Sequence, residues 1–253
     1  MKNFLQRFVT NFSQWWLQDS SISTLNNDLG FNYLVKYSGG GSHSDYLPML
    51  IALHGDGDTV DSFYESALNQ ISVPARIIII EGSISHEIGY VWPWSVAQFE
   101  QYGAVFNEDV DLLSTKYSTI GKPVLLGFSG GGGMAYYQAV KHGNSYSYIF
   151  PISSLLASEK LGDSSSQPSA KVYAYHGKSD TVIPFSEGKK TVKLLKKKKV
   201  EVSFIPFEGG HHGLFSEMKS EITQAIEERL QSFLYGSRLP DDSSSSESLT
   251  RHK

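Results

Sequence analysis

Cysteine is absent from the 253-residue sequence, and charged residues are few. The absence of cysteine excludes disulfide bonds, metal sites built from thiolates and a cysteine nucleophile. Charged side chains make up 19% of the chain, and the net charge of -4 provides no overall attraction to a polyanion. We therefore expect no nucleic-acid partner.

Long hydrophobic runs are also missing, so no segment has the roughly 20 apolar residues needed to span a bilayer. Polar residues interrupt the first 20 positions too often for the core of a signal peptide. We therefore expect a cytoplasmic protein by default. Aromatic and aliphatic residues fall roughly at helical spacing within residues 1–24, which predicts an amphipathic helix that packs on the domain or contacts a membrane surface.

Short apolar runs alternate with stretches compatible with helices, as in an α/β protein with a mostly parallel sheet. Four consecutive isoleucines at 77–80 indicate a strand covered by helices on both faces. The pattern predicts one domain over residues 25–238 and a disordered tail over 239–253, which has little apolar content. The expected strands are 31–37, 49–54, 76–81, 124–128, 148–152, 171–176 and 200–207, and the expected helices are 61–70, 96–117, 131–142, 186–199 and 214–235.

Ser129 lies in the motif Gly127-Phe128-Ser129-Gly130-Gly131, which directly follows an expected strand and precedes an expected helix. A serine at such a sharp strand-to-helix turn adopts a strained backbone conformation, and small neighbours are needed to accommodate it. Its hydroxyl is then presented at the sheet edge. We identify Ser129 as the candidate nucleophile.

A serine hydroxyl needs a base to take its proton, and the base needs an acid that orients it. Asp180 follows the expected strand 171–176, and His211 and His212 follow the expected strand 200–207. Because the ends of parallel strands meet at one sheet edge, we expect these side chains to converge on Ser129. We favour His211 over His212 as the base because two glycines precede it.

The developing negative charge in acyl transfer needs hydrogen-bond donors. Gly130, the residue after the nucleophile, offers one backbone N–H. The loop His54-Gly55-Asp56-Gly57-Asp58 follows another expected strand and offers a second from Asp56. A glycine turn between strand and helix explains the same loop, and the two interpretations are compatible.

With these motifs the chain resembles the α/β-hydrolase superfamily, and within it the phospholipase/carboxylesterase group that includes acyl-protein thioesterases. The resemblance is carried by LHGDGD at 53–58, GFSGG at 127–131, HGKSDTVIP at 176–184 and GGH at 209–211. It implies an α/β-hydrolase fold with an eight-stranded sheet, esterase or thioesterase activity and no cofactor. It also implies a triad of Ser129, Asp180 and His211, with Asp56 and Gly130 in the oxyanion hole.

The chain departs from that group in two places. Gly130 stands where relatives similar to thioesterases usually carry glutamine. The loop after the four isoleucines is long and aromatic, so Tyr90, Trp92 and Trp94 either wall a substrate pocket or pack under the loop.

These features predict a serine hydrolase acting on small-molecule or lipid esters, or on thioesters. Peptidase or polyester depolymerase activity on the same fold, and a non-catalytic binding module, remain alternatives. We expect no metal site, because Asp56, Asp58 and Asp61 lack the ligand register of a calcium loop. Basic residues at 189–199 indicate a solvated helix face or a contact with anionic lipid, and both monomer and homodimer remain open.

Overall fold

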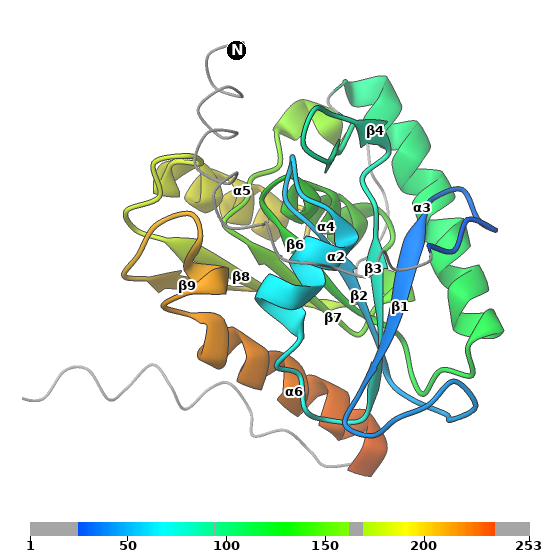
Figure 1. Ribbon diagram of the computed structural model, residues 1–253. Coiled ribbons are helices and arrows are strands. Elements are labelled where there is room, and N and C mark those ends of the chain that lie inside the picture. The colour runs from blue at the N-terminus through cyan, green and yellow to red at the C-terminus, as the bar shows by residue number, and fades with distance from the viewer. Residues whose placement is uncertain (1–24, 94, 162–168, 236–253) are drawn as a thin grey trace, which may run out of the picture.

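A computed structural model describes residues 25–93, 95–161 and 169–235 of the protein (Figure 1). Its central sheet has the strand order β1-β3-β2-β6-β7-β8-β9. Every neighbouring pair is parallel except β1 with β3. The prediction of a mostly parallel α/β sheet is therefore confirmed. The described residues contain seven strands in this sheet rather than the eight that the resemblance implied.

The elements follow the alternation expected from the sequence. The strands of the main sheet are β1 Tyr33–Ser38, β2 Met49–Leu53, β3 Ala75–Ile80, β6 Val124–Phe128, β7 Tyr148–Ile152, β8 Lys171–Gly177 and β9 Val202–Phe207. A two-stranded sheet pairs β4 Ile84–Ser85 with β5 Tyr90–Val91. The α-helices are α2 Val60–Phe63, α3 Val96–Lys116, α4 Ser129–Lys141, α5 Phe185–Lys197 and α6 Lys219–Tyr235.

Two helix predictions need correction. The expected helix 61–70 is a short α-helix, α2, that continues as a π-helix over Tyr64–Leu68. The expected helix 214–235 begins instead as a 3-10 turn at Gly213–Phe215, and α6 starts only at Lys219. Apolar periodicity runs through both breaks, so the sequence pattern alone does not reveal them.

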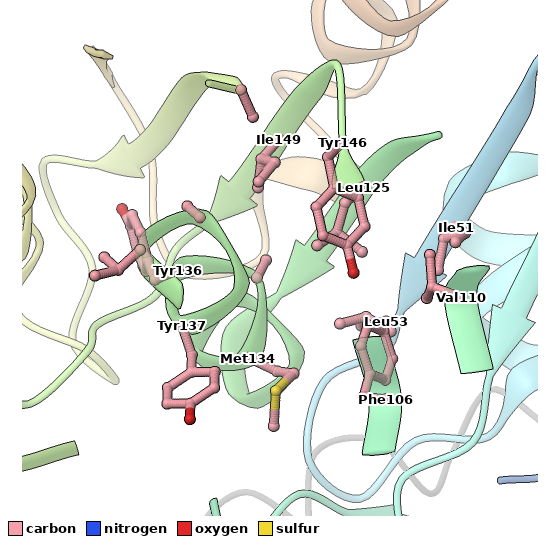
Figure 2. Packing of buried hydrophobic residues seen from close by; sticks show 14 of the residues in the cluster. Ile51, Leu53, Phe106, Val110, Leu125, Met134, Tyr136, Tyr137, Tyr146 and Ile149 are labelled. Carbon is pink, nitrogen blue, oxygen red and sulfur yellow. The ribbon is translucent and has the colours of Figure 1, made fainter. Parts of the chain in front are cut away.

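Both faces of the sheet are buried, because alternate residues of each strand enter different hydrophobic clusters. On β2, Ile51 and Leu53 join the cluster under α3, α4 and α5, whereas Leu50 and Ala52 join the cluster under α2 and α6. Figure 2 shows Phe106 and Val110 of α3 beside Ile51 and Leu53 on the first of these faces. All six residues of β3 are buried, as four successive isoleucines predicted.

Within the described ranges, no helix is both long and apolar enough to cross a membrane. The predicted amphipathic helix at 1–24, the predicted tail at 239–253 and Trp94 lie outside the described residues.

Candidate active site

The site lies at the carboxyl edge of the parallel sheet, where the loops after four strands meet. Ser129 follows β6 directly, Asp180 follows β8 and His211 follows β9. The loop 54–58 follows β2, which pairs with β6. Parallel strands therefore bring segments that are far apart in the sequence to one place.

Ser129 occupies the strained turn that the motif predicted. Its φ of 50° is in the left-handed region, and it is the first residue of α4. The close approach of α4 to β2 requires glycine at 131, because a Cβ there would lie 2.5 Å from the carbonyl oxygen of His54. The N–H of Gly131 donates to that same oxygen at 3.2 Å.

The structure brings Ser129, His211 and Asp180 into one hydrogen-bonded chain. The Nε2 atom of His211 lies 3.0 Å from the Ser129 hydroxyl, and its Nδ1 lies 2.9 Å from Oδ2 of Asp180. The three residues are only 4%, 4% and 6% exposed, in that order. His212 instead places its ring 5.1 Å from the His211 ring and 5.9 Å from Phe128. Of the two histidines, His211 is the one beside the hydroxyl.

Both oxygens of Asp180 accept hydrogen bonds. Oδ1 accepts from the backbone N–H groups of Val182 and Ile183 at 2.9 and 2.8 Å. Oδ2 accepts from His211, and Nε2 of His176 lies 3.4 Å from the same oxygen. Burial alone would raise the pKa of this carboxyl, but the hydrogen bonds from His176 and His211 lower it well below its usual value. Asp180 is therefore held as a carboxylate.

Sequence reasoning missed two residues that touch this chain of contacts. His176 is fully buried, and its Nε2 donates to the carbonyl oxygen of Ile183 at 2.9 Å while facing Asp180. Ser154, in the loop after β7, donates its hydroxyl to the carbonyl oxygen of Ser129 at 2.6 Å. The only sequence signal for His176 was its place at the end of a strand, four residues before Asp180.

The two backbone N–H groups expected to bind an oxyanion have no partner among the described residues. The N–H of Gly130 is in the first turn of α4, where helix geometry provides no acceptor. No described group accepts from the N–H of Asp56. Gly55 packs against Phe128 and Ser129, since a Cβ at Gly55 would lie 2.8 Å from the Phe128 ring and 3.5 Å from Ser129 Cβ. The 54–58 loop therefore lies directly beside Ser129.

His54 holds this loop in place through both ring nitrogens. Nδ1 donates to the carbonyl oxygen of Gly55 at 2.7 Å, and Nε2 accepts from the N–H of Gly82 at 2.9 Å. These two contacts require the neutral ring with its proton on Nδ1. Complete burial lowers the pKa of His54 to about 4.

The low pKa of His54 predicts that acid destabilises the fold. Between its unfolded pKa of 6.5 and its folded pKa of about 4, the unfolded chain binds a proton that the folded chain does not. The contribution of His54 to the free energy of unfolding should therefore fall by about 2 kcal/mol between pH 7 and pH 5. Urea unfolding of the wild type and of His54→Gln at both pH values isolates this difference. An identical pH dependence in both proteins would contradict the assignment.

Asp56 also contributes a largely buried side chain. Burial raises the pKa of this carboxyl to about 6, although the N–H of Trp92 and the charges of Lys160 and His86 act in the opposite direction. Its Oδ1 accepts from the backbone N–H of Trp92 at 3.1 Å. The carboxyl group thus links the 54–58 loop to the segment after β5.

The three aromatic residues predicted near the substrate have different outcomes. Trp92 is 2% exposed, and its Nε1 donates to the carbonyl oxygen of His54 at 2.8 Å. Its ring therefore packs under the loop, the second of the two alternatives, rather than lining an open pocket. Tyr90 is half-buried in β5, and its position in a pocket wall stays a prediction. Trp94 is outside the described residues.

Within the described part of the chain, no group of three or more histidines and carboxylates could hold a metal ion.

Solved structures similar to this chain include carboxylesterases and an acyl-protein thioesterase. A carboxylesterase from Mesorhizobium loti superposes with a TM-score of 0.69 at 17% identity, covering 81% of this chain and 99% of its own. The Bacillus cereus carboxylesterase gives 0.62 at 14% identity, covering 81% and 96%. Acyl-protein thioesterase 2 from Zea mays gives 0.59 at 22% identity, covering 78% and 98%. At these identities the likeness establishes the fold alone, the α/β-hydrolase fold.

The family of the protein is identified from its sequence. A search among curated proteins found no match. The sequence model of the phospholipase/carboxylesterase family matches residues 97–230, more than half of the chain, including Ser129, Asp180 and His211. The protein therefore belongs to the phospholipase/carboxylesterase family of α/β-hydrolases.

Proposed function

We propose that the protein hydrolyses carboxylic esters or thioesters through a covalent acyl-enzyme on Ser129. The observation that carries the proposal is the hydrogen-bonded chain from Asp180 through His211 to the Ser129 hydroxyl, with distances of 2.9 and 3.0 Å. A serine hydroxyl becomes an effective nucleophile when an oriented imidazole accepts its proton.

In the first half of the reaction, Ser129 Oγ attacks the carbonyl carbon of the substrate, and Nε2 of His211 takes the hydroxyl proton. The carbonyl oxygen becomes an oxyanion and accepts hydrogen bonds from the backbone N–H groups of Asp56 and Gly130. Collapse of this intermediate breaks the bond to the alcohol or thiol, and His211 protonates the leaving group. The Asp180 carboxylate stabilises the imidazolium throughout.

In the second half, water releases the acid. His211 removes a proton from a water molecule, whose oxygen attacks the acyl carbon. The second oxyanion uses the same two N–H groups, and its collapse returns the proton to Ser129. The products are a carboxylic acid and the alcohol or thiol, and the protein returns to its starting state.

A fluorophosphonate probe tests the nucleophile directly. We expect the native protein to be labelled at Ser129, with loss of ester hydrolysis, and Ser129→Ala to be unlabelled. Ser114→Ala is the matched control, because the Ser114 hydroxyl donates only within α3, to the carbonyl oxygen of Val110 at 3.0 Å. Equal labelling of wild type and Ser129→Ala would reject the proposal. A protein that binds esters without labelling or turnover would instead be a binding module.

A series of substrates measures whether the protein prefers esters, thioesters or amides. We expect turnover of p-nitrophenyl esters and of an acyl thioester, and slower cleavage of a matched amide, since the amine is the poorer leaving group. Faster cleavage of the amide would favour the peptidase alternative, and release of acid from an insoluble polyester would favour the depolymerase. A lysophospholipid in the same series tests for lipid substrates.

A further inference from the structure

The side chain of Asp56 is placed against the nucleophile turn. A Cβ built on Gly130 would lie 2.4 Å from Oδ1 and 2.5 Å from Oδ2 of Asp56. The carboxyl group thus occupies the space that any side chain at position 130 would need. Gly130 follows Ser129 directly, so the carboxyl group lies next to the point of attack.

This carboxyl group is incompletely hydrogen-bonded. Oδ1 accepts from the N–H of Trp92 at 3.1 Å. Among the described residues no group donates to Oδ2, and no cation forms an ion pair with Asp56. The residue is partly exposed, and Oδ2 is not among the enclosed polar atoms that lack a partner. Oδ2 is therefore an accessible acceptor on a largely buried carboxylate, and such a group gains most from a donor that completes its hydrogen bonds.

The charges that act on the Asp56 carboxyl group are positive. Lys160 and His86 are the charged side chains that act on Asp56, and the Lys160 ammonium lies 4.3 Å from the centre of the Phe99 ring. In the proposed acyl-enzyme, the acyl group on Ser129 has its carbonyl oxygen at the N–H of Gly130, so the carboxyl group packed against Gly130 lies close to that acyl group.

We propose that Asp56 is a specificity-determining residue, whose carboxylate accepts a hydrogen bond from a hydroxyl or ammonium group on the acyl part of the substrate. This inference rests on the function proposed above and narrows its substrate class to polar acyl groups. A plain aliphatic acyl chain would cover the Oδ2 atom without offering it a donor, at a cost in binding to a buried charge.

Three matched esters test the proposal: ethyl butanoate, ethyl 3-hydroxybutanoate and ethyl 3-aminobutanoate, followed by acid release at constant pH. For the wild type we expect kcat/KM to be about 10- to 100-fold higher for at least one of the substituted esters than for the plain ester, as a hydrogen bond to a charged group allows. Comparison of the hydroxyl ester with the ammonium ester shows which donor the site binds. The positive charge of Lys160 repels an ammonium group.

Two substitutions remove the acceptor in different ways, and both keep the backbone N–H of residue 56. Asp56→Leu should abolish the preference, so that ethyl butanoate is cleaved at least as well as the substituted esters. In Asp56→Asn the N–H of Trp92 retains the amide oxygen, so the NH₂ group faces the substrate. The kcat/KM of the ammonium ester should then no longer exceed that of the plain ester. The hydroxyl ester can still accept a hydrogen bond from the NH₂ group. Asp111→Asn, on the exposed face of α3, should behave like the wild type.

The outcomes separate this inference from the proposed function. If Ser129 is labelled and the esters are cleaved, but the ratios between them are the same in Asp56→Leu, Asp56→Asn and the wild type, Asp56 does not determine specificity. If the fluorophosphonate fails to label Ser129, the proposed function fails and this inference falls with it. Asp56→Asn preserves the shape of the side chain. If Asp56→Leu misfolds, the ester ratios of Asp56→Asn therefore still decide the test.

Discussion

Replacing Asp180 by asparagine is expected to lower kcat for ester hydrolysis by about 10⁴-fold, the effect typical of an amide in place of the orienting carboxylate in a serine triad. The structure explains why an amide cannot substitute here. Oδ1 of Asp180 accepts from two backbone N–H groups, those of Val182 and Ile183. Oδ2 faces His211 and His176. Both edges of the side chain therefore need an acceptor, and an amide has only one.

The orientation of the amide follows from these contacts. Two fixed backbone donors at 2.9 and 2.8 Å hold the amide oxygen at the Oδ1 position. The NH₂ group then points at Nδ1 of His211, which must lose its proton and accept. The ring proton moves to Nε2, and Nε2 can no longer accept a proton from the Ser129 hydroxyl, which lies 3.0 Å away.

Steady-state kinetics with a p-nitrophenyl ester measure this effect, and Asp109→Asn is the control. Asp109 is also a buried aspartate, accepting from the N–H of Gly30 at 2.8 Å, but it lies on α3, outside the hydrogen-bonded chain of Asp180, His211 and Ser129. We expect the control to affect stability rather than kcat. A decrease of less than tenfold in Asp180→Asn would mean that Asp180 does not orient the base.

The second large effect concerns the fold at the turn around Ser129, where Gly131→Ala should lower the free energy of unfolding by about 3 kcal/mol. The added Cβ would lie 2.5 and 2.6 Å from the carbonyl oxygens of His54 and Leu53, and both are main-chain atoms that cannot rotate away. The helix must move off β2, which also strains the hydrogen bond from Gly131 to His54.

Gly133→Ala is the matched control, two residues further along the same helix. Its Cβ would lie 3.2 Å from the carbonyl oxygen of Leu155 and 3.9 Å from the Ser154 hydroxyl, so a small adjustment suffices. The higher helix propensity of alanine offsets that cost by up to about 1 kcal/mol. Urea unfolding at pH 7 compares the two variants with the wild type. Equal stability of the two variants would contradict the packing argument.

The packing of Gly130 and Gly131 affects both the stability of the fold and the position of the proposed active-site groups. The same close approach that excludes a side chain at 131 places the 54–58 loop beside Ser129, and Gly130 leaves room for the Asp56 carboxyl group. The glycine run 130–133 is therefore tightly packed at 131. At position 130 it creates space that Asp56 fills.

Much of the architecture was predictable from local patterns. The β6 and β7 boundaries agree with the expected runs 124–128 and 148–152, because short apolar runs flanked by turn residues leave few alternatives. The order of Ser129, Asp180 and His211, each after a strand, was enough to place them at one edge, since parallel strands end on the same side. The breaks before α6 and after α2 were not predictable, because they interrupt no apolar period.

The sequence by itself determined the fold class and the meeting of Ser129, Asp180 and one of two neighbouring histidines at the sheet edge, because strand periodicity and glycine-rich turns are local properties of the chain. Only the tertiary structure decided which histidine reaches Ser129, that His176 faces Asp180, and that the Asp56 carboxyl group covers Gly130. These contacts depend on the directions of side chains that are 4 to 82 positions apart in the sequence. Such directions are set by packing in three dimensions, and no spacing along the chain encodes them.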